Sequence, residues 1–197
     1  MKGITIFTSL VLAVCALCSF MPLSDEAEIY DNTVRLHVLA NSDSEHDQEV
    51  KLCVRDAVLS HITELTADAE SADEAEAIIA ENIQSLCNTA KNVLLGLSED
   101  KDVSVTLSKE YYPTREYGDI RLPAGTYSSL RVMIGEAKGQ NWWCVLYPEL
   151  CTNSAKADET LVKTGFSKDQ IDILTGGEEP KYRLKFKILE IFEKSFG

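Results

Sequence analysis

The stretch that decides the fold runs from Leu130 to Pro148 and reads LRVMIGEAKGQNWWCVLYP. In its first part, apolar residues alternate with others, which predicts a half-buried strand. The alternating apolar positions are Leu130, Val132 and Ile134. Two glycines within residues 135–141 indicate a tight turn. Residues 142–147 then predict a return strand that ends at the proline, so the whole stretch predicts a β-hairpin.

Upstream of this hairpin, the apolar residues recur at helical spacing in two segments. The first predicted helix covers residues 45–65 and begins at Ser42 or Ser44, either of which fits an N-cap. The second covers residues 71–97 and begins at Ser71, which is followed three residues later by a glutamate, as in a capping box. Both helices have one apolar side, so we expect them to pack on a common core.

Two further segments predict strands. Residues 33–40 are rich in Val, Leu and His and are typical of a buried strand. Residues 103–107 alternate between apolar and polar residues and predict a half-buried strand. Residues 111–123 show no clear period and predict a long loop. This order of elements predicts an α+β fold, with a mainly antiparallel sheet packed against a helix pair and with a C-terminal helix.

The N-terminus is typical of an export signal. Lys2 is the only charged residue before Asp25, and residues 4–23 are almost entirely apolar. A short basic start followed by an apolar run is typical of a signal peptide, and this run is also nearly long enough for a membrane anchor. We therefore expect residues 1–23 to be a signal peptide or an N-terminal anchor, and the only contact with the membrane to be through this segment.

The rest of the chain divides into three parts. Residues 27–151 are expected to form the α+β core domain. Residues 152–180 form a polar connecting segment, with one short helix expected at residues 167–174. Residues 181–197 alternate in a way that fits a strand or a helix, and we expect a helix that docks on the core.

The charge of the chain limits its partners. The formal net charge is −13 and 45% of the residues are hydrophobic, which is typical of a globular protein. A strongly acidic surface repels nucleic acid and anionic lipid, so we expect neither as a partner. The same charge also helps to keep an exported protein in solution.

Four cysteines lie beyond the N-terminal segment. Cys144 and Cys151 have Pro148 between them, so a turn there would allow a disulfide; two buried free thiols are the alternative. Cys53 and Cys87 lie on or beside the apolar faces of the two helices, where they would meet if the helices pack antiparallel, or remain two buried thiols. We expect no metal site, because the sequence has no CxxC or HxxxH pair.

One catalytic arrangement can be drawn from the sequence. His37, Ser42 and Asp47 lie close together in the chain and would suit a hydrolase if they met in space. Sequence proximity does not supply that geometry, and His37 fits a core histidine of a strand equally well. We therefore expect no enzymatic activity, with a secreted hydrolase that uses residues 37–47 as the alternative.

Several blocks of the chain resemble one protein family. They are residues 35–44, 47–48 and 54–58, then 122–127, 130–135 and 141–151, and residues 186–190 near the end. Their combination resembles the stage II sporulation protein R family. This resemblance implies a signal of endospore-forming bacteria that is exported into the space between the forespore and mother-cell membranes. It implies that the protein activates a membrane-embedded aspartic protease, which then processes the sigma E precursor, and it implies no cofactor.

The resemblance does not say which residues contact the protease. Adjacent residues of a strand face opposite ways, so at most one of Trp142 and Trp143 can point into the core, and the other is free to anchor an interface. We expect the partner to bind through Arg131, Asn141, Trp142 and Trp143.

Overall fold

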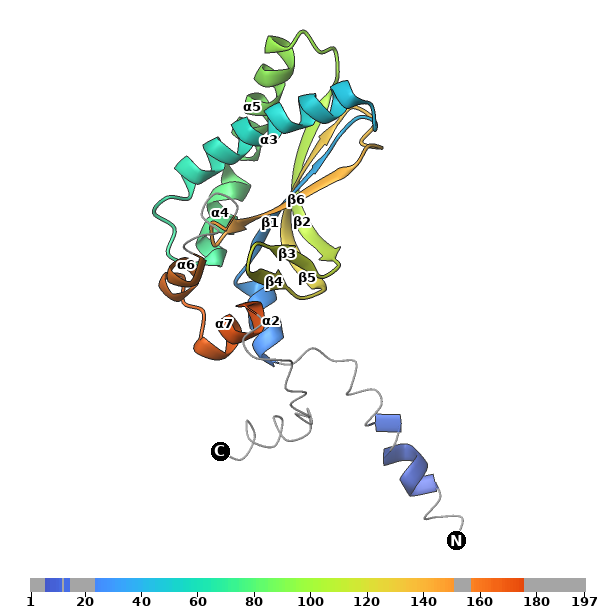
Figure 1. Ribbon diagram of the computed structural model, residues 1–197, viewed down its shortest axis with the longest axis vertical. Helices are drawn as coiled ribbons and strands as arrows, with labels where there is room; N and C mark the ends of the chain where they lie inside the picture. The colour runs from blue at the N-terminus through green and yellow to red at the C-terminus, as the bar shows by residue number, and fades with distance from the viewer. Residues whose placement is uncertain (1–5, 12, 15–23, 151–156, 176–197) are drawn as a thin grey trace.

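Strand β1 (Val34–Leu39) is one of the two inner strands of the main sheet (Figure 1). The computed structural model describes residues 6–11, 13, 14, 24–150 and 157–175. The other strands of this sheet are β2 (Val103–Tyr112), β5 (Gly125–Ile134) and β6 (Asn141–Tyr147). Their order is β2-β5-β1-β6. The β2–β5 and β1–β6 pairs are antiparallel, while β1 and β5 are parallel. The predicted α+β fold with a mainly antiparallel sheet is confirmed.

The predicted hairpin of residues 130–148 is wrong in one respect. Strands β5 and β6 both form where expected, but they do not pair with each other, because β1 lies between them. All six residues of β1 are buried, and a strand buried on both faces is suited to an inner position. The connection between β5 and β6 therefore crosses the end of β1 instead of forming a tight turn.

Glycine allows this crossing to be close. Gly135 has a φ of +56°, and a Cβ there would lie 2.3 Å from Oδ1 of Asn41. A Cβ on Gly139 would lie 2.2 Å from the backbone oxygen of Ser42, while the Gly139 N–H donates to the oxygen of Ala40 at 3.0 Å. Both glycines are thus needed for the loop to lie against the end of β1.

Three helices cover one face of the sheet, which we call the helix face. They are α3 (Glu45–Leu65), α4 (Ala72–Glu81) and α5 (Ile83–Gly96), and Figure 1 shows them along one side of the strands. The predicted bounds of α3 are confirmed, and Ser44 and Ser71 cap α3 and α4 by accepting from the N–H groups of Asp47 and Glu74. The predicted second helix is divided at Asn82, whose side chain donates to the oxygen of Ile78.

The helices and the helix face share one hydrophobic core. It includes Leu36, Val38, Val54, Ile79, Leu86, Leu130 and Val132. The opposite face carries a second, smaller core at one end, which includes Ile29, Tyr112, Ile120, Leu122, Tyr127 and Phe166. A two-stranded hairpin, β3 (Arg115–Tyr117) with β4 (Ile120–Leu122), belongs to this second core. We therefore call the opposite face of the sheet the hairpin face.

The predicted loop of residues 111–123 is wrong at this hairpin. Strands β3 and β4 have only three residues each, too few for a recognisable period. Ile120 and Leu122 are buried by contacts with distant residues of the second core, which the local sequence does not show. Helix α2 (Ser24–Asp31) closes the core with α7 (Lys168–Thr175), which confirms the helix expected at residues 167–174. Helix α6 (Ala157–Lys163), which was not expected, adds Leu161.

Several expectations fall on parts of the chain outside the described residues. These include most of the N-terminal segment 1–23, the C-terminal helix of residues 181–197, and Cys151 as the partner of the buried Cys144. They stay predictions. Cys53 and Cys87 are free thiols, so the pairing considered between them is not formed. Within the described ranges, no helix combines the length and the apolar character that a membrane crossing requires.

Candidate functional site

The hairpin face carries a row of side chains that crosses all four strands. In register, Thr106 lies beside Arg131, Arg131 beside His37, and His37 beside Trp143. Because alternate residues of a strand share a face, these side chains point the same way. Asn141 follows the same alternation on β6 and lies exposed at the end of the sheet.

His37 holds this row together by hydrogen bonds. Its Nδ1 lies 3.0 Å from Oε1 of Glu110, and its Nε2 lies 3.0 Å from Oδ1 of Asn141. Glu110 also accepts from the Ser129 hydroxyl at 2.9 Å and forms an ion pair with Arg131 at 3.7 Å. His37 is buried and bonded on both ring nitrogens, so its position is fixed from two strands.

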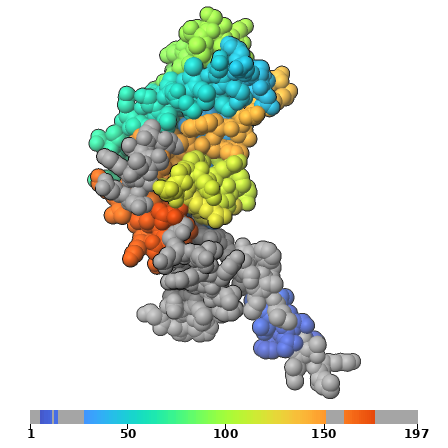
Figure 2. Space-filling model, in the orientation of Figure 1, coloured from blue at the N-terminus to red at the C-terminus, as the bar shows by residue number. Residues whose placement is uncertain are grey.

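Trp143 lies between His37 and the β3–β4 hairpin. Its ring centroid is 5.6 Å from that of His37, and the guanidinium carbon of Arg115 lies 3.8 Å from the centroid of the indole. Such cation–π stacking holds the planar guanidinium parallel to an aromatic surface. Trp143 is half-buried, so part of the indole remains at the surface. Figure 2 shows the hairpin (yellow-green) at the surface next to the orange segment of β6.

Trp142 lies on the helix face instead. It packs against the main core, and the guanidinium carbon of Arg55 on α3 is 4.8 Å from its ring centroid. The structure therefore brings together three of the four residues predicted to contact a partner, Arg131, Asn141 and Trp143. Trp142 is turned away from them, as the alternation of a strand requires.

Beneath the hairpin, Arg35 is enclosed by aromatic rings, a feature that the sequence analysis did not find. Its guanidinium carbon lies 3.9 Å from the ring centroid of Tyr112 and 4.9 Å from that of Tyr127, and it donates a hydrogen bond to the Tyr117 hydroxyl. Burial raises the pKa of Tyr112 well above its ordinary value. An arginine within an otherwise apolar strand was the only sign of this arrangement in the sequence.

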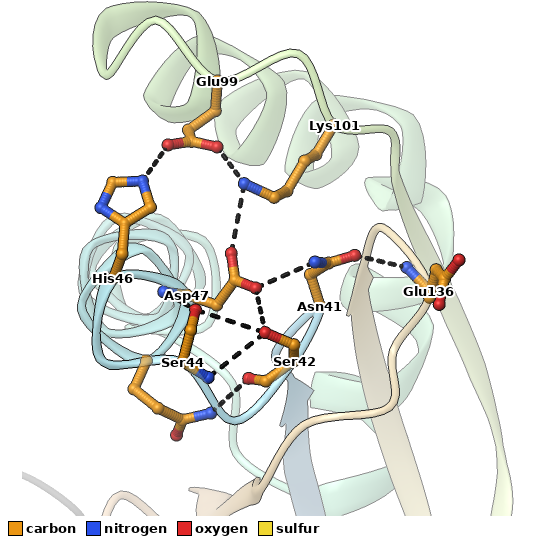
Figure 3. Close-up of polar contacts among 9 residues, drawn as sticks. Asn41, Ser42, Ser44, His46, Asp47, Glu99, Lys101 and Glu136 are labelled. Carbon is orange, nitrogen blue, oxygen red and sulfur yellow. Dashed lines mark hydrogen bonds and ion pairs between the residues drawn. The ribbon is translucent and has the colours of Figure 1, made fainter.

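The residues of the alternative hydrolase site lie in two different places. Asp47 accepts hydrogen bonds from Asn41, at 2.9 Å, and from Ser42, and pairs with Lys101 at 3.2 Å (Figure 3). His37 is on the hairpin face and bonds Glu110 and Asn141, and no bond joins it to Ser42 or Asp47 in the described structure. The arrangement that a Ser-His-Asp hydrolase needs is therefore not assembled.

The network around Asp47 instead stabilises the start of α3. Hydrogen bonds from Ser42, and next from Asn41, hold the pKa of the Asp47 carboxyl well below its usual range. The neighbouring Glu99 pairs with Lys101 and His46, and its hydrogen bond from Lys101 lowers its own pKa. The same bond raises the pKa of Lys101. Three elements, the β1 end, α3 and the residues before β2, are joined in this way (Figure 3).

Among the described residues, no group of three or more His, Cys, Asp or Glu side chains is arranged so that it could hold a metal ion.

Comparison with known proteins gives one clear match. Residues 30–157, which include every strand of the structure, match the family model described as Stage II sporulation protein R. The chain is 39% identical over 123 residues to the Stage II sporulation protein R of Bacillus subtilis (strain 168). That alignment covers 62% of this chain and 55% of the relative, so the chain spans about half the length of the relative that it matches. No solved structure matches the chain.

Proposed function

The chain belongs to the stage II sporulation protein R family, and from this premise we propose that it is an exported signal that activates a membrane-embedded aspartic protease. That protease processes the sigma E precursor in the mother cell. The match of residues 30–157 to the family carries the proposal. The apolar residues 4–23 support export into the space between the forespore and mother-cell membranes, where the extracytoplasmic part of the protease is accessible.

The hairpin face is our proposed contact surface for the protease. It presents a half-buried tryptophan, an exposed asparagine and a partly exposed arginine, which are residue types that suit an interface. The bonds of His37 to Glu110 and Asn141 fix these side chains before binding, which reduces the entropy that binding costs. In this proposal the protein acts as a ligand. The alternative hydrolase that uses residues 37–47 loses its support, because His37 does not meet Ser42 and Asp47.

Reconstitution in a bacterium that does not form spores tests this function. The chain, the membrane protease and the sigma precursor are expressed together, and the size of the precursor is followed. We expect cleavage only when the chain is present and retains residues 1–23. Cleavage of equal extent without the chain, or none with it, would contradict the proposal.

A further inference from the structure

Arg115 has a fixed position but no acidic partner among the described residues. Its guanidinium stacks on the indole of Trp143 at 3.8 Å, and its buried Nε has no hydrogen-bond partner. It forms no ion pair with any residue that the structure describes. A guanidinium has five N–H donors in one plane, and stacking leaves the edge of that plane available to an acceptor.

Arg131 lies within the same row, on the far side of His37 from Trp143, and its charge is only partly neutralised. Its Nε is 3.7 Å from Oε1 of Glu110, too far for a hydrogen bond, and is likewise unpartnered in the described structure. The Arg131 side chain is 34% exposed, so solvent or a partner reaches it. Buried arginine donors without acceptors are rare in folded proteins, so the unpartnered Nε atoms of Arg115 and Arg131 call for an explanation.

The charges of the two faces differ. On the strands of the hairpin face, including the hairpin side that packs on it, the described cations are Arg35, Arg115 and Arg131, and the one carboxylate is Glu110, which pairs with Arg131. The helices on the other face carry many more carboxylates than cations, and the whole chain has a net charge of −13. Among the described residues, an acidic partner is therefore repelled by the helix face and attracted by the hairpin face, which also orients it during encounter.

We propose that the hairpin face binds a carboxylate-bearing segment of the protease, in which one acidic side chain pairs with Arg115, stacked on Trp143, and another pairs with Arg131, on the far side of His37. This inference rests on the proposed function and names the chemistry of the partner. Arginine and carboxylate form paired, nearly planar hydrogen bonds, which the terminal N–H groups of both side chains would donate. A long polyanion such as nucleic acid fits poorly, because it would extend from this face onto the acidic remainder.

Charge reversal in the full chain tests the proposal. The variants R115E and R131E are compared with R121E, which makes the same charge change at an exposed residue of β4 whose neighbours Ile120 and Leu122 point into the core. In the reconstituted system we expect R115E and R131E each to lower precursor cleavage by roughly tenfold or more, and R121E to stay within about twofold of the wild type. An Asp→Lys or Glu→Lys change in the outer part of the protease should restore the activity of one of them.

The outcomes separate this inference from the proposed function. If the wild-type chain gives no cleavage, the proposed function itself is rejected. If the wild-type chain gives cleavage, and R115E and R131E cleave as much precursor as R121E does, only the acidic contact is rejected. Thermal melting of the purified variants shows whether they fold. A variant that does not fold is replaced by R115Q or R131Q, which removes the charge without reversing it. If the wild type binds phosphatidylglycerol vesicles and both R115E and R131E lose this binding, the proposal of a protein partner is rejected in favour of an anionic membrane.

Discussion

Trp142 and Trp143 are neighbours in the chain but lie on opposite faces of the sheet. Trp142 packs against the main core beneath Arg55 of α3, and Trp143 lies beside His37 beneath Arg115 of the hairpin. One strand, β6, thus connects the structural core to the proposed contact surface, and we expect the two tryptophans to have separable roles.

Replacement of each tryptophan by alanine should show this separation. Both variants lose part of a packed ring, so we expect each to lower the free energy of unfolding by about 1–4 kcal/mol. Only W143A should also lower precursor cleavage when the amounts of folded protein are matched, because only Trp143 lies on the contact surface. Equal cleavage by W143A and W142A at matched folded concentrations would argue against this assignment.

Asn141→Ala should destabilise the hairpin face. It removes the acceptor 3.0 Å from Nε2 of His37 and leaves that ring nitrogen without its partner, which should cost about 1 kcal/mol and lower the midpoint of urea unfolding. Gln140→Ala is the control. The hydrogen bonds of Gln140 to Asp43 and Lys51 are made by its backbone N–H and C=O groups, which the alanine variant keeps. A midpoint equally low in both variants would mean that the His37 bond contributes little.

The Asp47 network predicts a dependence of stability on pH. Because the pKa of Asp47 is lowered in the folded protein, its contribution is complete above the unfolded value of about 4 and is lost as the pH falls below it. Asp47→Asn should therefore flatten the loss of stability on acidification below about pH 4, as measured by urea unfolding across that range. Glu45→Gln, a change at an exposed residue of the same first helical turn, should leave the acid dependence as in the wild type.

The crossing loop predicts a sharp contrast between two glycines. Gly139→Ala places a Cβ 2.2 Å from the backbone oxygen of Ser42, so the loop must move, and we expect a loss of about 1–3 kcal/mol. Gly96→Ala, at the end of α5, meets nothing within 4 Å and should be neutral or stabilising by up to about 1 kcal/mol. Thermal melting of the two variants checks this, and a G139A variant as stable as the wild type would show that the crossing is not close.

The sequence predicted the features that depend on neighbouring residues. The bounds of α3 follow from the Ser44 cap and an apolar stripe, and the opposite orientation of Trp142 and Trp143 follows from strand alternation. Features that depend on distant residues were missed. Nothing local in residues 130–148 shows that β1 pairs between the two strands, and nothing in residues 111–123 shows that Arg115 will stack on Trp143.

The candidate site shows the same division between local and distant contacts. Arg131, Asn141 and Trp143 lie in or beside recognisable strands, and their shared face could be expected once these strands were placed. His37 was interpreted as a core histidine, and the structure does bury it, but its bonds to Glu110 and Asn141 join residues 73 and 104 positions away. Contacts over such distances come from the fold, since a single sequence does not show which strands pair.

The most direct test of the account is a map of the contact with the protease. A photo-crosslinking amino acid is placed at Thr106, exposed in the row of the hairpin face, or at Ser60, exposed on α3 of the helix face. Each full-length variant is expressed with the membrane protease and irradiated. We predict a crosslinked product containing the protease from position 106 and none from position 60. A product from position 60 without one from position 106 would contradict the hairpin face as the contact surface.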